Sequence, residues 1–194
     1  MGQAGLRIIA GALKGRRLET PDWPGLRPTS DRLRETLFNV LAPRLAGAHF
    51  LDAFAGTGAI GIEALSRGAA AVTFVEQDPR ALRLIEANLA RCRVEDRYAI
   101  IRAGFAGFAL SEAGAGAPAE SKGFDLLFLD PPYGQAELAA SLDAAAPLVG
   151  PGSLLVIEHA WRDEAPVEVS GLRRTRQLRS GDSALSFYDR HPDV

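Results

Sequence analysis

Short apolar runs alternate with amphipathic segments along most of this chain. Five runs have the length and composition of buried strands, at residues 48–53, 71–76, 97–102, 124–129 and 153–158. The segments between them predict helices at residues 59–67, 79–91, 105–111 and 135–146. Strands that alternate with helices through short loops predict an α/β fold, in which helices cover both faces of a mostly parallel sheet.

The residues before the first core strand predict two smaller elements. Short alternating pieces around Gly11 and Gly15 indicate a β-hairpin. Ser30 is the expected N-cap of a helix whose apolar face consists of Leu33, Leu37, Val40 and Leu41. We therefore expect a single domain, with residues 1–28 as an N-terminal hairpin extension and residues 29–194 as the α/β core.

Composition narrows the class of protein. Hydrophobic residues make up 47% of the 194 residues, which is enough for one well-buried domain. No uncharged apolar stretch is long enough to cross a bilayer, and no secretory leader is apparent. The lone Cys92 and three scattered histidines predict neither a disulfide nor a metal site. These features predict a cytoplasmic protein that uses no metal and has no membrane partner, with a mobile Ala-, Gly- and Ser-rich loop at residues 113–122.

Charge is distributed unevenly although the net charge is only −2. Residues 1–45 hold eight Lys and Arg against four Asp and Glu, and residues 171–190 hold five against two. The body between them holds nine against seventeen. Because phosphate contacts come from Lys and Arg, the N-terminal cluster predicts a nucleic-acid partner, with a solvated surface as the alternative. For the C-terminal arginines both interpretations stay open.

A glycine turn follows the first predicted core strand. Gly56 and Gly58 allow a tight backbone turn that a ligand can approach, and Gly61 allows the next helix to pack close to the sheet. Glu76 ends the second strand, 18 residues after Gly58, where a carboxylate can accept hydrogen bonds from both hydroxyls of an adenosine ribose. The spacing suits a dinucleotide or S-adenosylmethionine, and a solvated strand end is the alternative for Glu76.

The fourth predicted core strand leads into Asp130-Pro131-Pro132-Tyr133. Each of the two prolines fixes its φ at about −65° and lacks an N–H donor. The nearby carbonyls are therefore free to face a ligand. Carboxylate and carbonyl oxygens can accept both hydrogens of an exocyclic amine while Tyr133 stacks on the ring that carries it. A rigid loop after a core strand is the simpler alternative.

Taken in order, these motifs resemble class I S-adenosylmethionine-dependent methyltransferases. That family carries an acidic residue and Gly-x-Gly after the first strand, an acidic residue after the second, and Asp/Asn-Pro-Pro-Tyr/Phe after the fourth in amine-methylating members. More narrowly, segments Arg7–Gly11, Lys14–Leu18 and Arg27–Asn39 are similar to the RsmD family of bacterial 16S rRNA guanine-N2 methyltransferases. The likeness spans nearly the whole chain and is weakest at residues 103–123 and after about residue 159.

The resemblance implies a Rossmann-like fold with a seven-stranded sheet, closed by an antiparallel pair at residues 167–169 and 184–188. It implies S-adenosylmethionine as cofactor, and as partner 16S rRNA within the small ribosomal subunit or an assembly intermediate. We also expect a monomer. Where family members often carry Asp or Asn near the cofactor adenine, this chain has Gly104, so adenine recognition would depend on backbone N–H groups and Phe105.

The motifs, the charge distribution and the resemblance together assign three sets of residues. Transfer to the guanine N2 amine would depend on Asp130, Pro131 and Tyr133. The cofactor would be held by Asp52, Ala55, Gly56, Thr57, Gly58, Glu76, Phe105 and Asp130. RNA would be contacted by Arg7, Lys14, Arg16, Arg17, Arg27, Arg32 and Arg34.

Three other functions remain open at this point. An adenine-N6 DNA or RNA methyltransferase uses the same tetrapeptide, although the DNA enzymes usually add a recognition domain for which this chain has no room. A nicotinamide oxidoreductase shares the glycine spacing but leaves the tetrapeptide unexplained. A nonenzymatic RNA-binding factor in ribosome assembly would need neither the glycine turn nor the tetrapeptide. The intact Gly56, Gly58, Glu76 and Asp130 therefore argue against this function.

Overall fold

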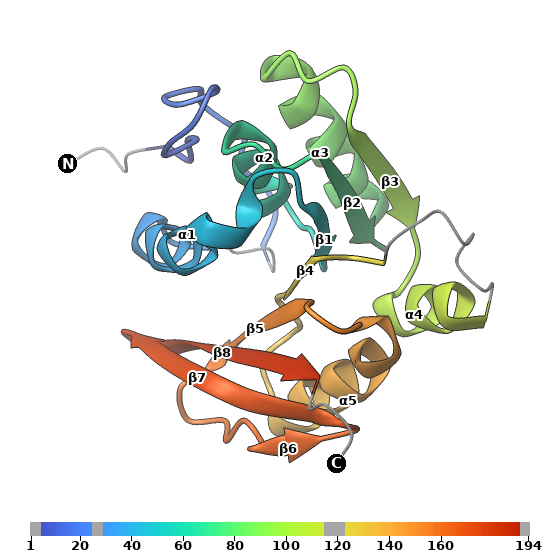
Figure 1. Cartoon of the computed structure of the whole chain (residues 1–194). Helices are drawn as coiled ribbons and strands as arrows, with labels where there is room; N and C mark the ends of the chain where they lie inside the picture. The colour runs from blue at the N-terminus through green and yellow to red at the C-terminus, as the bar shows by residue number, and fades with distance from the viewer. Residues whose placement is uncertain (1–4, 25–28, 115–122, 191–194) are drawn as a thin grey trace. The chain divides into compact units, whose positions relative to one another are not determined.

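The computed structural model describes residues 5–24, 29–114 and 123–190 (Figure 1). The chain divides into two compact units, Met1–Arg102 and Ala103–Val194. Within the described residues, no helix is both long and apolar enough to span a bilayer. The loop predicted at residues 113–122 lies almost entirely outside the described residues, and Arg27 lies outside them as well.

The first unit contains a parallel sheet of three strands, β1 (His49–Ala53), β2 (Ala71–Glu76) and β3 (Tyr98–Arg102). β2 lies in the middle and pairs with both neighbours. The described part of this unit also contains three helices: α1 (Asp31–Leu45), α2 (Ala59–Ser66) and α3 (Pro79–Arg91). Every residue of α2 is buried, since the helix packs against β1 and β2 and also contacts α1.

Local sequence signals explain where these helices begin. The Ser30 side chain accepts a hydrogen bond from the Leu33 N–H, and the Asp78 side chain accepts one from the Arg80 N–H. The predicted Ser30 N-cap is therefore confirmed, and Asp78 plays the same role for α3. Pro79 occupies the first turn of α3, where a missing N–H costs nothing.

The N-terminal segment, described over residues 5–24, contains less regular structure than the β-hairpin that we expected. Its two arms are joined by a single antiparallel bridge between Arg7 and Arg17, and by hydrogen bonds such as Ile8 N–H to Arg16 O at 2.9 Å. Over its described residues 5–24, the segment is a tight hairpin-like loop without strands. Gly11 passes so close to α2 that a Cβ there would lie 2.0 Å from the Ser66 carbonyl oxygen. The loop is held by these contacts with α2.

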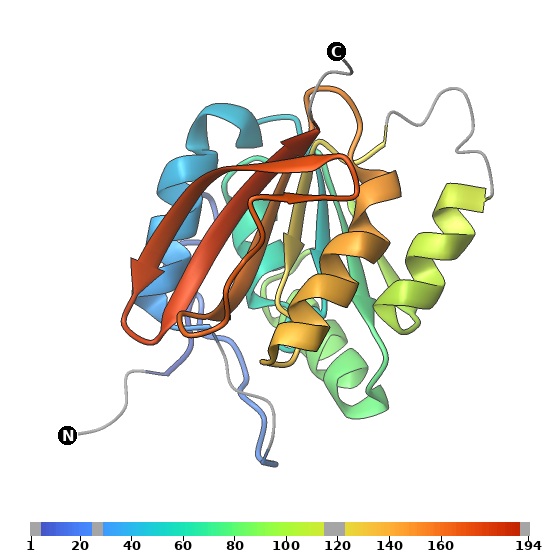
Figure 2. The ribbon, with the colours of Figure 1, turned by 90° about the horizontal axis from the view of Figure 1, so that it is seen from below.

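The second unit contains five strands among its described residues: β4 (Leu126–Leu129), β5 (Leu154–Ala160), β6 (Glu168–Val169), β7 (Leu172–Ser180) and β8 (Ser183–Arg190). They follow the order β4-β5-β8-β7-β6, with β4 and β5 parallel and the other pairs antiparallel. Figure 2 shows β7 and β8 as a long antiparallel pair. The helices are α4 (Phe105–Gly114), α5 (Gln135–Ala145) and a 3-10 turn, η1 (Ala146–Leu148).

The five predicted core strands are all present, with ends within two residues of the predicted ones. The seven-strand expectation was wrong, because the two units together contain eight strands in the described residues. The missed strand is β7, whose sequence is LRRTRQLRS. Its many arginines indicated a charged margin rather than a strand, since β7 buries only Leu172 fully.

Candidate active site

The glycine turn after β1 has the backbone that its sequence predicts. Gly56 and Gly58 have φ values of 54° and 74°, in the left-handed region that glycine adopts without steric cost. Phe54, just before them, has φ 60°, a conformation that costs a non-glycine residue about 1–3 kcal/mol. Such strain persists where the surrounding contacts enforce it, and it is frequent at ligand sites.

Glu76 anchors the glycine turn to the end of β2. Its Oε2 accepts the Gly56 N–H at 2.9 Å, and its Oε1 accepts the N–H groups of Gln77 and Asp78 at 2.7 and 2.8 Å. The side chain is half-buried, so solvent or a ligand can still reach it. Each carboxylate oxygen has two lone pairs, and Oε2 uses only one of its own in these bonds.

Asp52 lies beneath the glycine turn and is almost completely buried. The residue is only 2% exposed, and its Oδ2 accepts the Gly61 N–H at 2.8 Å, which fixes the first turn of α2. Burial raises the pKa of this carboxyl to about 8; the nearby Glu76 charge adds to the rise, and the Gly61 hydrogen bond opposes it. Asp52 therefore supports the glycine turn from below.

Asn88 is a supporting residue that sequence analysis missed. It is fully buried on α3, and its Nδ2 donates to the Thr57 carbonyl at 2.9 Å. Its Oδ1 accepts the Glu19 N–H at 2.6 Å, so one amide connects the glycine turn to the N-terminal segment. The available signal was an amide side chain on a helix face that otherwise carries Leu84, Ile85 and Leu89.

Glu63 is a second missed residue, and it holds the N-terminal segment on α2. Its carboxylate is completely buried and accepts the N–H groups of Ile9 and Ala10 at 2.7 and 2.9 Å. The Arg67 Nε donates to it at 2.7 Å, and the Arg34 Nη1 lies 3.7 Å away. A glutamate inside the apolar helix sequence AIGIEALS was the available signal.

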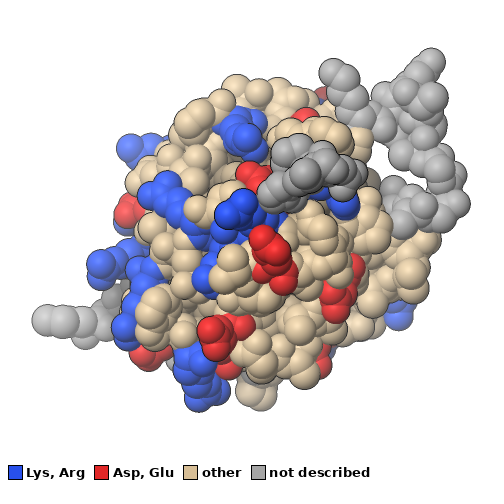
Figure 3. All heavy atoms as spheres, turned by 60° about the horizontal axis from the view of Figure 1, so that its bottom comes forward, with Lys and Arg blue, Asp and Glu red and all other residues tan. Residues whose placement is uncertain are grey.

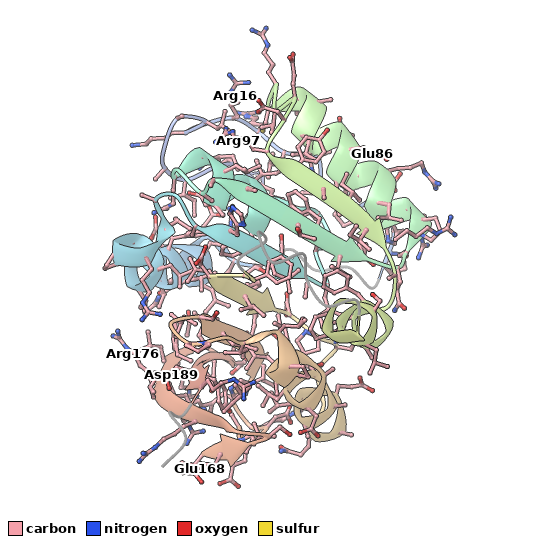
Figure 4. All side chains as sticks on the ribbon, turned by 45° about the vertical axis from the view of Figure 1, so that its right-hand side comes forward. Arg16, Glu86, Arg97, Glu168, Arg176 and Asp189 are labelled. Atoms are coloured by element: carbon pink, nitrogen blue, oxygen red, sulfur yellow. The ribbon has the colours of Figure 1, made fainter. Side chains whose placement is uncertain are left out.

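The predicted RNA-contacting residues differ in exposure. Four are exposed: Arg7, Lys14, Arg17 and Arg32. Arg16, labelled in Figure 4, is half-buried because its Nη1 donates to the Cys92 carbonyl at 2.7 Å. Arg34 departs from the expectation, since it is fully buried and its Nη2 donates to the Arg7 carbonyl at 2.9 Å and to Asp31 Oδ1 at 2.6 Å. A phosphate cannot reach a guanidinium enclosed in this way.

The tetrapeptide follows β4 in the second unit. All four residues of β4 are buried, and the chain emerges at Asp130, which is half-buried. Pro131 is buried, whereas Tyr133 is 53% exposed. The chain then enters α5 through Gly134, whose φ of 146° few other residues adopt. A rigid backbone thus presents a carboxylate and an aromatic ring at the carboxyl end of a buried strand.

The hydroxyl of Tyr133 is held by two partners from the same sheet. It lies 3.2 Å from Glu158 Oε1 on β5 and 2.9 Å from Ser183 Oγ at the start of β8. Burial raises the pKa of the Tyr133 phenol above its ordinary value, and burial likewise raises the pKa of the Glu158 carboxyl. Neither Glu158 nor Ser183 carried a sequence signal, because each becomes informative only when the strands are paired.

Phe105, the predicted adenine contact, begins α4 and is 5% exposed. Only a small part of its ring therefore reaches the surface. Among the residues that the structure describes, no three His, Cys, Asp or Glu side chains lie close enough together to hold a metal ion.

Comparisons with known proteins identify the family. Residues 6–189 match the family described as Conserved hypothetical protein 95. Ribosomal RNA small subunit methyltransferase D of Escherichia coli strain K12 is 35% identical over 191 residues, which cover 97% of this chain and 92% of the relative. The chain belongs to the methyltransferase D family. The resemblance stated from the motifs is confirmed.

Two further likenesses agree with membership of the methyltransferase D family. The putative rRNA methyltransferase YlbH of Bacillus subtilis strain 168 is 35% identical over 188 residues, covering 94% of this chain and 98% of the relative. A solved structure described as putative methyltransferase yhhF from Escherichia coli aligns with a TM-score of 0.78 at 31% identity, over 95% of this chain and 97% of that chain. The expected Rossmann-like methyltransferase fold is therefore confirmed.

Proposed function

We propose that this protein transfers the methyl group of S-adenosylmethionine to the exocyclic N2 amine of a guanine in 16S rRNA. The observation that carries the proposal is the Asp130–Tyr133 tip at the end of a buried strand, in a chain of the methyltransferase D family. The relatives' names supply the ribosomal substrate class. The tip supports an aromatic exocyclic amine as the acceptor, and the choice of guanine N2 follows from the resemblance alone.

The chemistry needs alignment more than activation of the methyl donor. A sulfonium methyl is already electrophilic, so the protein must place the amine in line with it and exclude water. The amine is a weak nucleophile because its lone pair is delocalised into the purine ring. Hydrogen bonds from its two N–H groups to Asp130 and the Pro131 carbonyl would favour a localised lone pair as the C–N bond forms and the sulfur–methyl bond breaks. S-adenosylhomocysteine would then leave, and the methylated amine would lose one proton to solvent. Tyr133 stacks on the base.

The cofactor is assigned to the glycine turn and to the strand end beside it. Backbone groups of Ala55, Gly56, Thr57 and Gly58 would hold the methionine part, and the partly exposed Glu76 would bind the ribose hydroxyls. Asp52 acts indirectly, through Gly61. Phe105 supplies the apolar contact to adenine, and Asp130 serves both cofactor and substrate.

The RNA partner is assigned to exposed basic residues of the N-terminal segment and α1. The exposed residues are Arg7, Lys14, Arg17 and Arg32, while Arg16 is only half-buried. Phosphate contacts from these side chains would position 16S rRNA, in the small subunit or an assembly intermediate, without reading its sequence. The protein acts as a monomer. Arg34 takes no part, because it is buried.

Transfer of labelled methyl from S-adenosylmethionine tests the proposal. The substrates are small ribosomal subunits lacking the modification, naked 16S rRNA and duplex DNA, each followed by nucleoside digestion. Label in N2-methylguanosine from rRNA or subunits is the expected result. Label in N6-methyladenine would assign the same chemistry to another base. No transfer to any substrate, despite tight cofactor binding, would contradict the proposal.

A further inference from the structure

Tyr133 combines a free ring with a restrained hydroxyl. The residue is 53% exposed, yet its Oη contacts Glu158 Oε1 at 3.2 Å and Ser183 Oγ at 2.9 Å. An exposed tyrosine on a loop ordinarily turns about two side-chain bonds. Two hydrogen-bond partners at the far end of the ring remove that freedom. The ring thus keeps one orientation while much of its surface stays available.

The two anchors come from strands whose register places them together. Ser183 pairs with Ala160, and Ala160 is two residues from Glu158 on β5. Side chains two residues apart on a strand, and side chains directly opposite across a strand pair, lie on the same face of a sheet. Glu158 and Ser183 therefore share the face that meets Tyr133. The anchors are part of the rigid sheet rather than of a loop.

The burial of Glu158 costs folding stability. It is 4% exposed, and its Oε2 has no hydrogen-bond partner among the described residues. Burying a carboxylate with one oxygen unsatisfied costs stability unless it has a compensating use. The other oxygen of Glu158, Oε1, accepts a hydrogen bond from the Tyr133 hydroxyl. This hydrogen bond with the Tyr133 hydroxyl gives the costly buried position a use.

We propose that Glu158 and Ser183 are positioning residues that hold the Tyr133 ring as a fixed stacking platform for the target base. This inference rests on the proposed function, because it requires a base to stack there. Stacking on a ring that is already oriented costs little conformational entropy, and it places the amine at a constant distance from Asp130. The anchors touch neither substrate nor cofactor and act only through the phenol.

A double-mutant cycle on methyl transfer to small ribosomal subunits tests this inference. Glu158→Leu removes the acceptor at similar volume, and Tyr133→Phe removes only the hydroxyl. We expect each to lower kcat by roughly tenfold while KM for the subunit changes less than about twofold, since phosphate contacts dominate RNA binding. In the Tyr133→Phe background, Glu158→Leu should have no further effect. Ser183→Ala should behave likewise, with a smaller loss.

Three comparisons separate positioning from structural damage. Glu158→Gln keeps an acceptor oxygen and should retain most of the activity. Glu168→Leu makes the same substitution at an exposed residue of β6 and should leave kcat unchanged. Unfolding of Glu158→Leu should occur at the wild-type temperature or above it, because a poorly satisfied buried carboxylate has been removed. An equal loss of kcat with and without the Tyr133 hydroxyl would overturn the inference.

A readout without turnover keeps the inference separate from the proposed function. The chain has three tyrosines, so Cζ-labelled tyrosine gives few signals, and Tyr133→Phe identifies the relevant one by its loss. Glu158→Leu should shift that signal and lower the Tyr133 pKa, since the Glu158 charge and hydrogen bond both raise it. An unchanged Tyr133 signal would refute the anchoring. A shifted signal with no methyl transfer by the wild type would refute only the proposed function.

Discussion

At the residue scale, Glu76 and Asp52 are acidic residues at the ends of neighbouring strands, yet their surroundings give them different roles. Glu76 is half-buried and accepts three backbone N–H groups. Asp52 is almost completely buried and accepts one, from Gly61. A buried carboxyl with a neighbouring negative charge retains its proton to higher pH.

Asp52 should make the stability of the protein depend on pH. Its pKa is about 8 in the folded state, against 3.8 without the fold, so the native state binds more protons between these values. Stability from this residue is therefore fully present below about pH 4 and is lost as pH rises towards 8, by at most about 1.4 kcal/mol per pH unit. Denaturant unfolding at several pH values measures it. Asp52→Asn should lack this slope, and parallel curves for variant and wild type would contradict the assignment.

Asp130 should matter for transfer and little for cofactor affinity. Asp130→Ala removes an acceptor that acts on the amine as charge develops, so we expect kcat to fall by about 10²–10³. The dissociation constant of S-adenosylmethionine, from calorimetry, should change less than about threefold, since most of its contacts lie elsewhere. Asp182→Ala, at an exposed turn, is the control. Near-normal turnover by Asp130→Ala would exclude the role.

At the scale of elements, α2 shows how packing enforces the glycine turn. The helix is buried along its whole length and begins at the turn itself. Its Gly61 lies against β2, where a Cβ would come within 2.2 Å of Phe74 Cε1 and 2.8 Å of Val72 Cγ1. The helix can approach the sheet this closely only with glycine at that position. This close packing also directs the N-terminus of α2 towards the glycine turn.

Two helix glycines should respond oppositely to alanine. Gly61→Ala overpacks the contact with Phe74 and should cost about 1–3 kcal/mol of unfolding free energy. Gly107→Ala in α4 meets nothing within 4 Å and should stabilise by about 0.4–1 kcal/mol, because it restricts the unfolded chain. Denaturant unfolding measures both. Equal effects of the same sign would show that close packing does not explain Gly61.

At the scale of the whole molecule, charge is grouped along the chain rather than spread evenly. The first 45 residues are basic and the body at residues 46–170 is acidic. Figure 3 shows Lys and Arg atoms in several groups on the face it presents, with Asp and Glu atoms between them. On β7, Arg176 is exposed and extends away from the ribbon (Figure 4). Such a surface favours binding of a polyanion at its basic groups and disfavours nonspecific binding of a polyanion to the acidic body.

The exposed basic residues of the N-terminal segment should determine how RNA binding depends on salt. Lys14→Ala and Arg17→Ala should each lower the slope of log affinity against log salt concentration by about 1. Binding of a 16S rRNA fragment at several salt concentrations measures the slope. Arg83→Ala, at an exposed position on α3, removes the same charge and should leave the slope unchanged. Equal slopes for all three variants would exclude the N-terminal segment as the RNA surface.

Prediction from sequence worked where a residue acts through its own backbone or its near neighbours. The core strands, the Ser30 N-cap and the glycine turn were all predictable, because apolar periodicity, capping and positive φ are local properties. It did not work for β7. Its many arginines gave no apolar pattern typical of a strand, and the strand forms because it pairs with β8.

The α/β alternation, the family and the candidate residues Gly56, Gly58, Glu76 and Asp130–Tyr133 could all be read from the chain's local patterns and motifs. The polar groups that support these residues became visible only once the chain was folded. Burial took Arg34 out of the RNA surface and made Asp52 a support beneath the turn. Strand register brought Glu158 and Ser183 to the Tyr133 hydroxyl, although 25 and 50 positions separate them from it along the chain. Such contacts depend on how strands pair in space, and spacing along the chain does not contain that information.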